Sequence, residues 1–336
     1  MLKKIFFLMV FVSLASCKEE ATSLNVLQGD AFGTTYTIQY YASETIELEQ
    51  ALDSVFYKVN KSVSTYMPQS DISKINAGDS TIQVDNIFKE VYRVSEIVYQ
   101  TSEGYFDPTI GVLRNAYGFG DTKPIKEIDS TTLDSLRQIV GFSKVKLNSD
   151  GTITKENTNI YFDFNAIAKG YGIDLIGELL DKNNIENYVI ELGGELLAKG
   201  KNLDKDAFWI AGIESPESDL ENRKYTARIS LQNSAMASSG NYRKFRMDTL
   251  SGKKYVHTIN PLTGKAEQSD VTSATVIAKT CIEADAYATT FMAMGFEKSK
   301  ALLEKLDGVE AYLTYNDSGN IPQVYSTEGM KEFLLD

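Results

Sequence analysis

The sequence has 336 residues, and its 34 lysine and arginine residues against 46 aspartate and glutamate residues give a net charge of −12. That acidic charge argues against a nucleic-acid partner, which needs a basic surface to contact phosphates. With one histidine and two cysteines the chain cannot build a Cys/His zinc cluster, so a divalent ion would be held by oxygen, which favours Mg²⁺ or Ca²⁺. The hydrophobic share of 43% and charged share of 24% are typical of a globular protein and exclude a disordered or collagen-like chain.

The N-terminus is typical of an export signal rather than of a fold. Met1–Lys4 is basic, and residues 5–14 form an apolar run about half as long as the ~20 residues that span a bilayer. The run leads into Leu-Ala-Ser-Cys17, which resembles a bacterial lipobox, with an ordinary secretory signal as the alternative. The sequence thus predicts a signal peptide over 1–16 and a tether over 17–25 that is lipidated at Cys17. The mature protein would be a lipid-anchored membrane lipoprotein of the bacterial cell envelope, facing the periplasm.

The remainder, residues 26–336, contains strand-like and helical patterns in alternation. A strand is predicted over 35–41, followed by amphipathic helices over 44–63 and 86–102, with Gly104 as the stop of the second. Further strands are predicted at 159–164, 188–192, 208–213, 225–231, 255–259 and 273–278, and further helices at 166–182, 282–294 and 298–306. The spacing is not that of regular βαβ units, and no Pro-, Gly- or Ser-rich linker divides the chain. We therefore expect a single compact α+β domain of one or two lobes.

Aromatic residues stand in three early segments that favour a planar ligand. Phe32 precedes a glycine at the entry to the first strand, and Tyr66 lies in a polar loop after the first helix. The segment Gly-Tyr105-Phe106-Asp107-Pro-Thr places two aromatic rings beside a carboxylate, which suits a hydrogen-bonding heterocycle. Each segment alone also fits a structural role, as a turn or as a cover over the core.

The segment Asp163-Phe-Asn165-Ala-Ile-Ala-Lys169-Gly runs from the end of a predicted strand into a helix, with Asn165 as its expected N-cap. A helix start offers free N–H groups and a positive dipole, and Lys169 adds a formal charge, so the segment favours phosphate binding. A capped helix with a solvated lysine is the alternative.

Two segments near the C-terminus carry polar groups of other kinds. One contains His257, the sole histidine, in Tyr-Val-His-Thr-Ile259-Asn260-Pro-Leu-Thr-Gly. The other is Glu-Ala-Asp285-Ala-Tyr-Ala-Thr289-Thr, in which the carboxylate and the hydroxyl share one helix face at i, i+4. Both oxygens can reach one hard cation, and Mg²⁺ needs few protein ligands because it keeps waters and binds substrate phosphates. The bare pattern is more often structural.

In this order and spacing, these segments resemble the ApbE family of FAD:protein FMN transferases, over about residues 32–295. The resemblance implies a Mg²⁺-dependent reaction in which FAD is split at its pyrophosphate and AMP leaves. FMN is then esterified through its phosphate to a Thr or Ser hydroxyl of an acceptor flavoprotein domain. A Mg²⁺-dependent FAD pyrophosphatase and a non-catalytic FAD-binding lipoprotein are the alternatives.

The resemblance also implies roles for single residues. The expected FAD contacts are Phe32, Tyr66, Tyr105, Phe106, Asp107, Asp163, Lys169 and Ile259. Asp285 and Thr289 would hold Mg²⁺ by their side chains and Ala166 through its backbone carbonyl. His257 is a candidate base for the acceptor hydroxyl, or else it hydrogen-bonds the flavin or braces its loop, and Asp107 and Asp163 are rival bases. The chain departs from the family pattern at Phe32, usually Met, and at Asn260, usually Asp.

Overall fold

A computed structural model describes most of the chain. It covers residues 22–44, 46–125, 128–215, 218, 224–241, 245–247, 252 and 254–335. The predicted signal peptide and Cys17 lie outside the described residues. Within those ranges, no helix combines the length and the apolar character that crossing a bilayer requires. Residues 23–25, expected to end the tether, begin the first strand instead, where they pair with residues 40–42.

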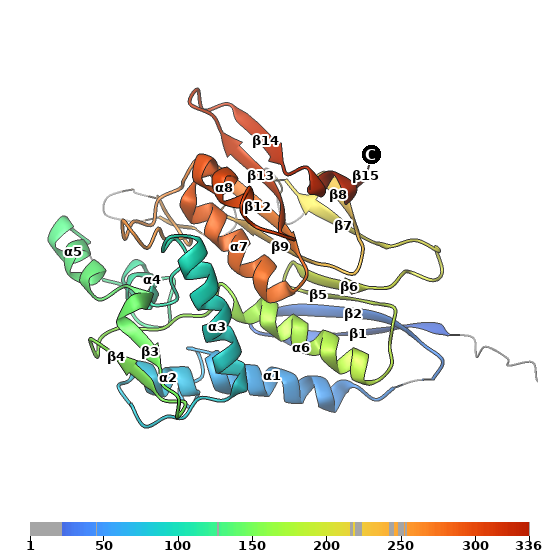
Figure 1. Cartoon of the computed structure of the whole chain (residues 1–336), viewed down its shortest axis with the longest axis horizontal. Helices are drawn as coiled ribbons and strands as arrows, with labels where there is room; N and C mark the ends of the chain where they lie inside the picture. Colours follow the sequence, from blue (N-terminus) through green and yellow to red (C-terminus); the bar gives the residue numbers. More distant parts are fainter. Residues whose placement is uncertain are drawn as a thin grey trace, which may run out of the picture.

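An antiparallel sheet of eight strands forms the centre of the described structure (Figure 1). Its strands, in spatial order, are β1 (Ser23–Ala31), β2 (Thr34–Ala42), β5 (Tyr188–Leu192), β6 (Glu195–Lys199), β9 (Ala235–Gly240), β12 (Val271–Ala278), β13 (Glu310–Asn316) and β14 (Pro322–Ser326). Neighbouring strands in this sheet follow one another in sequence order. The mixed α/β architecture confirms the predicted fold class.

The two faces of the sheet are covered differently because strand side chains alternate between them. In β12, Val276 packs into the main core, beneath helices α6 (Ala168–Lys182) and α7 (Cys281–Met294), whereas Ile277 belongs to a second core. That second core lies under a small sheet of three strands, β7 (Trp209–Glu214), β8 (Tyr225–Leu231) and β15 (Leu334–Leu335). Helices therefore cover one face and strands the other.

The remaining elements surround the helical layer. Helix α1 (Glu49–Val63) packs on α6, and α3 (Asn86–Thr101) packs on α7. The shorter elements are α2 (Asp71–Asn76), α4 (Gly111–Tyr117), α5 (Ser130–Gln138), α8 (Phe296–Leu303), β3 (Val145–Leu147), β4 (Ile153–Lys155), β10 (Phe245–Met247), β11 (Lys254–Val256) and the 3₁₀ turns 142–144 and 329–332. A third small core joins α4 and α5 to the segment that contains Ile259.

The strand predicted over 159–164 is not formed. Its alternation is real, since Ile160, Phe162 and Phe164 are buried, but its one backbone bridge joins Tyr161 to Ile110. The side chain of Asn76 explains the difference. Its amide group donates to the Phe162 carbonyl and accepts from the Phe162 N–H, at 2.9 and 2.8 Å, and so takes the place of a neighbouring strand. The helix predicted from residue 44 begins later, at Glu49, and the strand predicted over 255–259 ends at Val256.

Candidate active site

A cavity of about 380 Å³ lies at the end of α4, beside the starts of α6 and β6 and one face of α7. This volume falls within the usual range of small-molecule sites. Its walls contain eleven of the twelve predicted site residues of the fold: Tyr66, Tyr105, Phe106, Asp107, Asp163, Ala166, Lys169, His257, Ile259, Asp285 and Thr289. Segments that are far apart in sequence therefore meet at one place, as the resemblance implied.

Phe32 is the predicted site residue that does not line the cavity. It occupies the β1–β2 turn with a φ of 51°, and its ring packs edge-on against Phe56, with 5.5 Å between ring centroids. A Cβ at Gly172 would lie 2.6 Å from the Phe32 ring, so the ring is also wedged against α6. Packing between the hairpin and two helices accounts for this residue, and the expected contact with a flavin is not supported.

The beginning of α6 is bonded to α7 through a carboxylate. The backbone N–H of Gly170, the third residue of α6, donates to Oδ2 of Asp285 at 3.0 Å and so finds the partner that the first turn of a helix lacks. Ala166 lies before the start of the helix, and no described residue donates to its carbonyl. Asn165, predicted as the N-cap, does not cap this helix. Its side chain bonds to Asp163 instead.

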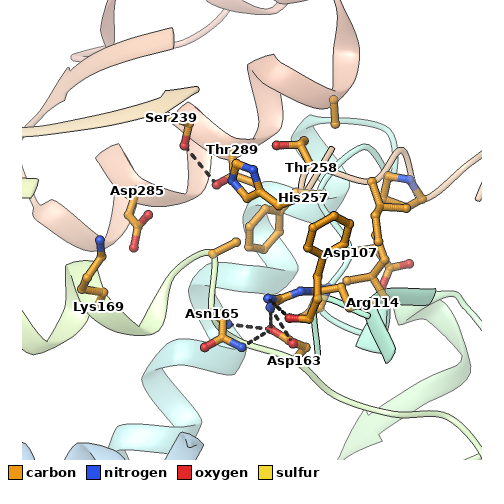
Figure 2. A pocket seen from close by; sticks show the side chains of 18 of the residues that line it. Asp107, Arg114, Asp163, Asn165, Lys169, Ser239, His257, Thr258, Asp285 and Thr289 are labelled. Atoms are coloured by element: carbon orange, nitrogen blue, oxygen red, sulfur yellow. Dashed lines mark hydrogen bonds and ion pairs between the residues drawn. The ribbon is translucent and has the colours of Figure 1, made fainter. Parts of the chain in front are cut away.

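Oxygen atoms suited to a hard cation meet beside this bond. Asp285 is 5% exposed, and its second carboxylate oxygen receives no hydrogen bond from the described residues. Thr289 lies one turn further along α7, where its hydroxyl is 3.4 Å from that of Ser239 and next to His257 (Figure 2). The described residues contain no cluster of three or more His, Cys, Asp or Glu side chains suited to a metal. One carboxylate, one hydroxyl and one carbonyl still fit Mg²⁺, which takes its other ligands from water and phosphate.

Burial raises the pKa of Asp285, against the opposing effects of Lys169 and the Gly170 N–H. A buried carboxylate resists ionisation unless positive charge lies nearby. In Figure 2 the ammonium group of Lys169 points toward Asp285. A cation bound at the Asp285 carboxylate would favour its charged form, and this agrees with the oxygen set described above.

Lys169 forms an ion pair with Glu195 at the start of β6, rather than standing alone in solvent. Burial alone would lower the pKa of Lys169, but Glu195 and Asp285 outweigh it and raise that pKa, so the ammonium form is favoured. Burial raises the pKa of Glu195. The sequence reasoning missed Glu195, whose signal was its position directly after Gly193-Gly194 at the end of a strand.

Asp163 is held by a second residue that the sequence reasoning missed, Arg114 of α4. One guanidinium nitrogen of Arg114 lies 2.6 Å from each carboxylate oxygen of Asp163 (Figure 2). Burial would lower the pKa of Arg114, and Asp163 and the Tyr66 hydroxyl more than compensate, so the pKa is raised. Arg114 could have been found from the sequence because it lies on a short helix directly after the Asp-Pro-Thr motif. Both oxygens of Asp163 therefore accept hydrogen bonds inside the protein, which fits a structural role.

Asp107 connects two loops. One carboxylate oxygen accepts from the N–H and the hydroxyl of Thr109, and the other accepts from the N–H of Phe142. Burial raises the pKa of Asp107 to about 6 despite these bonds. With both oxygens bonded inside the protein, Asp107 supports the cavity wall.

Asn260 suits its turn without the charge that the family pattern has there. Its side-chain oxygen accepts from the N–H groups of Leu262 and Thr263, and its amide nitrogen donates to the carbonyl of Ala293. An unprotonated aspartate could not make the last bond. The substitution therefore joins the His257 segment to the end of α7.

Comparison with known proteins agrees with this geometry. The sequence model of the ApbE family matches residues 32–313. The FAD:protein FMN transferase of Haemophilus influenzae is 33% identical over 320 residues, which cover 92% of this chain and 91% of that protein. The FAD:protein FMN transferase of Vibrio cholerae is 33% identical over 333 residues, or 96% of each chain.

Solved structures extend the similarity to the fold. The flavin transferase ApbE from Vibrio cholerae aligns with a TM-score of 0.81 at 31% identity, covering 94% of this chain and all of that one. The apo form of the Pseudomonas stutzeri flavinyl transferase ApbE aligns with a TM-score of 0.80 at 26% identity, covering 93% and 96%. The chain belongs to the ApbE family, and it is a transferase.

Proposed function

We propose that the protein is a Mg²⁺-dependent FAD:protein FMN transferase that links FMN to a Thr or Ser hydroxyl of an acceptor flavoprotein domain and releases AMP. The observation that carries the proposal is that aromatic rings and a cation-compatible oxygen set line one cavity. The curated relatives of similar length bear the name of this activity.

The aromatic residues of the cavity would account for recognition of the flavin. Tyr66, Tyr105 and Phe106 line the cavity, and Tyr66 is 60% exposed, so its ring is available for stacking. The hydroxyl of Tyr105 accepts a hydrogen bond from Lys298 of α8, which fixes this ring from outside. A planar ring system would be held between these side chains.

The polar residues of the cavity would account for the transfer reaction. Asp285, Thr289 and the Ala166 carbonyl would hold Mg²⁺, which would neutralise pyrophosphate charge and stabilise the leaving phosphate of AMP. Lys169 adds a fixed positive charge beside the same phosphates. His257 would accept the proton of the acceptor hydroxyl while the new P–O bond forms and the bond to AMP breaks. Positioning supplies most of the catalysis in such transfers, so one modest base is sufficient.

We also propose that the mature protein is a lipoprotein anchored through Cys17 and facing the periplasm. The basic start, the apolar run and the lipobox-like sequence support this proposal. If it is correct, the Cys17→Ser protein should leave the membrane fraction, and mass spectrometry should find no lipid on its N-terminus. A wild-type protein without N-terminal lipid would contradict the proposal.

The decisive test incubates the purified protein with FAD, Mg²⁺ and a candidate acceptor domain. Covalent flavin fluorescence on a denaturing gel and AMP release are measured for the wild type, for Asp285→Ala and for Asp307→Ala, an exposed control. We expect a fluorescent acceptor band with the wild type and the control, and none with Asp285→Ala or in the presence of EDTA. AMP release with no fluorescent band for any acceptor would identify a pyrophosphatase. FAD binding with neither product would identify a binding protein.

A further inference from the structure

Glu195 places a buried carboxylate at the cavity by means of a tight hairpin. It opens β6 directly after the two-residue turn Gly193-Gly194, in which both glycines have a positive φ, 62° and 105°. Such a turn fixes the register of the two strands, and with it the place of the first side chain of β6. Glu195 is 6% exposed and lines the cavity.

The ammonium group of Lys169 is held at this hairpin. It forms the ion pair with Glu195 and also donates to the Gly193 carbonyl at 3.5 Å. Apart from that ion pair, Oε2 of Glu195 has no partner among the described residues. A buried carboxylate that lost its counter-charge would be left uncompensated, and this favours a lasting pair.

A second carboxylate lies close to the same ammonium group. In Figure 2 the side chain of Lys169 points toward Asp285, and both residues line the cavity. The backbone also connects them, because the N–H of Gly170, the next residue along the chain, donates to Oδ2 of Asp285. The other oxygen of Asp285 receives no hydrogen bond from the described residues, yet the ion pair that Lys169 forms is with Glu195.

The choice of partner matters for a cation at Asp285. An ammonium group paired with the free oxygen of Asp285 would compete with Mg²⁺ for that oxygen, since both are positive. Lysine carries its charge on a flexible stem of four carbons and can turn between two neighbouring carboxylates. Glu195, fixed by its hairpin, gives the ammonium group a partner of its own.

We propose that Glu195 is a positioning residue that holds Lys169 away from Asp285 and so leaves the Asp285 carboxylate open to Mg²⁺. Glu195 acts through the lysine, so its effect on the cation should vanish when the lysine is absent. The inference rests on the proposed function, because it assigns Mg²⁺ to Asp285.

A cycle of single and double variants tests the proposal. FAD binding is followed by the quenching of its fluorescence at a series of Mg²⁺ concentrations, without an acceptor, for the purified full-length protein and each variant. We expect Glu195→Gln to raise the Mg²⁺ concentration for half-maximal FAD binding by about tenfold, as for other residues that orient a metal site. When Lys169→Met is added to Glu195→Gln, this concentration should return to that of Lys169→Met alone, because the competing ammonium group is gone.

Two further variants serve as controls. Glu178→Gln also removes one negative charge, from the exposed pair that Glu178 forms with Lys182 on α6, and should keep the wild-type Mg²⁺ requirement. Glu195→Asp keeps the charge on a shorter side chain and should lie between the wild type and Glu195→Gln. Circular dichroism establishes that each variant is folded. If Glu195→Gln does not fold, Glu195→Met, an apolar replacement of similar length, takes its place in the cycle.

Three outcomes would overturn the inference. One is a folded Glu195→Gln protein that needs no more Mg²⁺ than Glu178→Gln. Another is an equal increase with and without Lys169, because Glu195 would then act on the cation directly or through the fold. The third is wild-type FAD binding that does not depend on Mg²⁺.

The transfer assay separates this inference from the proposed function. A wild type that transfers no flavin to any acceptor, while the variant cycle gives the expected result, refutes the transferase and leaves the role of Glu195 standing. Normal transfer by the wild type, together with an unchanged Mg²⁺ requirement in Glu195→Gln, refutes only this inference.

Discussion

The backbone N–H of Gly170 and the carboxylate of Asp285, 115 residues apart, form a 3.0 Å hydrogen bond that joins α6 to α7. This bond has two results at the cavity. It orients the only carboxylate of the proposed cation set, and it satisfies an N–H in the first turn of α6. The Ala166 carbonyl, just before that turn, receives no donor from the described residues.

Replacing Gly170 with alanine should weaken both the fold and the site. The added Cβ would lie 2.3 Å from the carbonyl oxygen of Cys281 and 2.9 Å from the Cβ of Asp285, so the helices would have to separate. We expect a loss of about 1–3 kcal/mol in the free energy of unfolding, typical of overpacking, and loss of transfer activity. Urea denaturation and the fluorescent-band assay measure these two effects. Gly177→Ala is the control in the same helix, since its Cβ meets the flexible end of Leu197, and it should keep its activity.

Asp174 of α6 caps α7 from outside that helix. It accepts from the N–H groups of Cys281 and Ile282 at 2.7 and 2.9 Å, whereas the N-cap residue Thr280 makes no side-chain capping bond. Asp174→Ala should lower the free energy of unfolding by about 1–2 kcal/mol, the cost of a lost cap, and should weaken Mg²⁺-dependent FAD binding. Asp129→Ala removes the equivalent cap of α5 and should leave that binding unchanged. If FAD binding depends on the Mg²⁺ concentration equally in the two variants, this cap is not linked to the oxygen set of Asp285 and Thr289.

The raised pKa of Asp107 predicts a specific pH dependence of the free energy of unfolding. Burial raises the pKa of Asp107 from the ordinary 3.8 to about 6. Its contribution to the free energy of unfolding is therefore fully present below pH 3.8 and is lost as the pH rises through 6. The stability difference between wild type and Asp107→Asn should fall by up to about 3 kcal/mol between pH 4 and 7. Urea denaturation at several pH values measures this difference. Asp79, whose pKa is lowered by hydrogen bonds from Thr81, should show the opposite trend on substitution by Asn.

His257 should affect the transfer step more than flavin binding. His257 lines the cavity and is the sole histidine of the sequence, and imidazole is the commonest general base, so we propose that it takes the proton of the acceptor hydroxyl. We expect His257→Asn to lower the transfer rate about 100-fold or more, in the range of general-base catalysis, with unchanged FAD affinity. Rate and affinity are measured on the same preparation. A parallel loss of both would instead assign His257 to bracing its loop.

The sequence predicted the members of the cavity better than their partners. The i, i+4 spacing of Asp285 and Thr289 on one helix is a local property, and the structure places both at the cavity. The partners Glu195 and Arg114 lie 26 and 49 residues from Lys169 and Asp163, so no local pattern connects them.

The incorrect local predictions share a physical cause, which is competition from tertiary contacts. Asn165 has the side chain of an N-cap, but its amide nitrogen donates to the nearby Asp163 carboxylate, and the N–H of Gly170 in the first turn of α6 donates to Asp285 instead of to a capping side chain. The 159–164 segment has the alternation of a strand, yet the Asn76 amide satisfies its backbone. Propensity describes what the backbone prefers in isolation, and these side chains offer it other partners.

The strand order of the large sheet has a consequence for how the protein is assembled. Because neighbours in the described sheet follow one another in the chain, each new strand can add to an edge that already exists, and none must insert between two earlier ones. The cavity cannot form step by step in the same way, because its lining includes Tyr66 from early in the chain and Thr289 from near its end. A nascent chain that stops before α7 would contain most of the strands of the sheet but would lack the cavity residues Asp285 and Thr289. The cavity is therefore complete only after the early and the late segments of the chain have both been made and have folded.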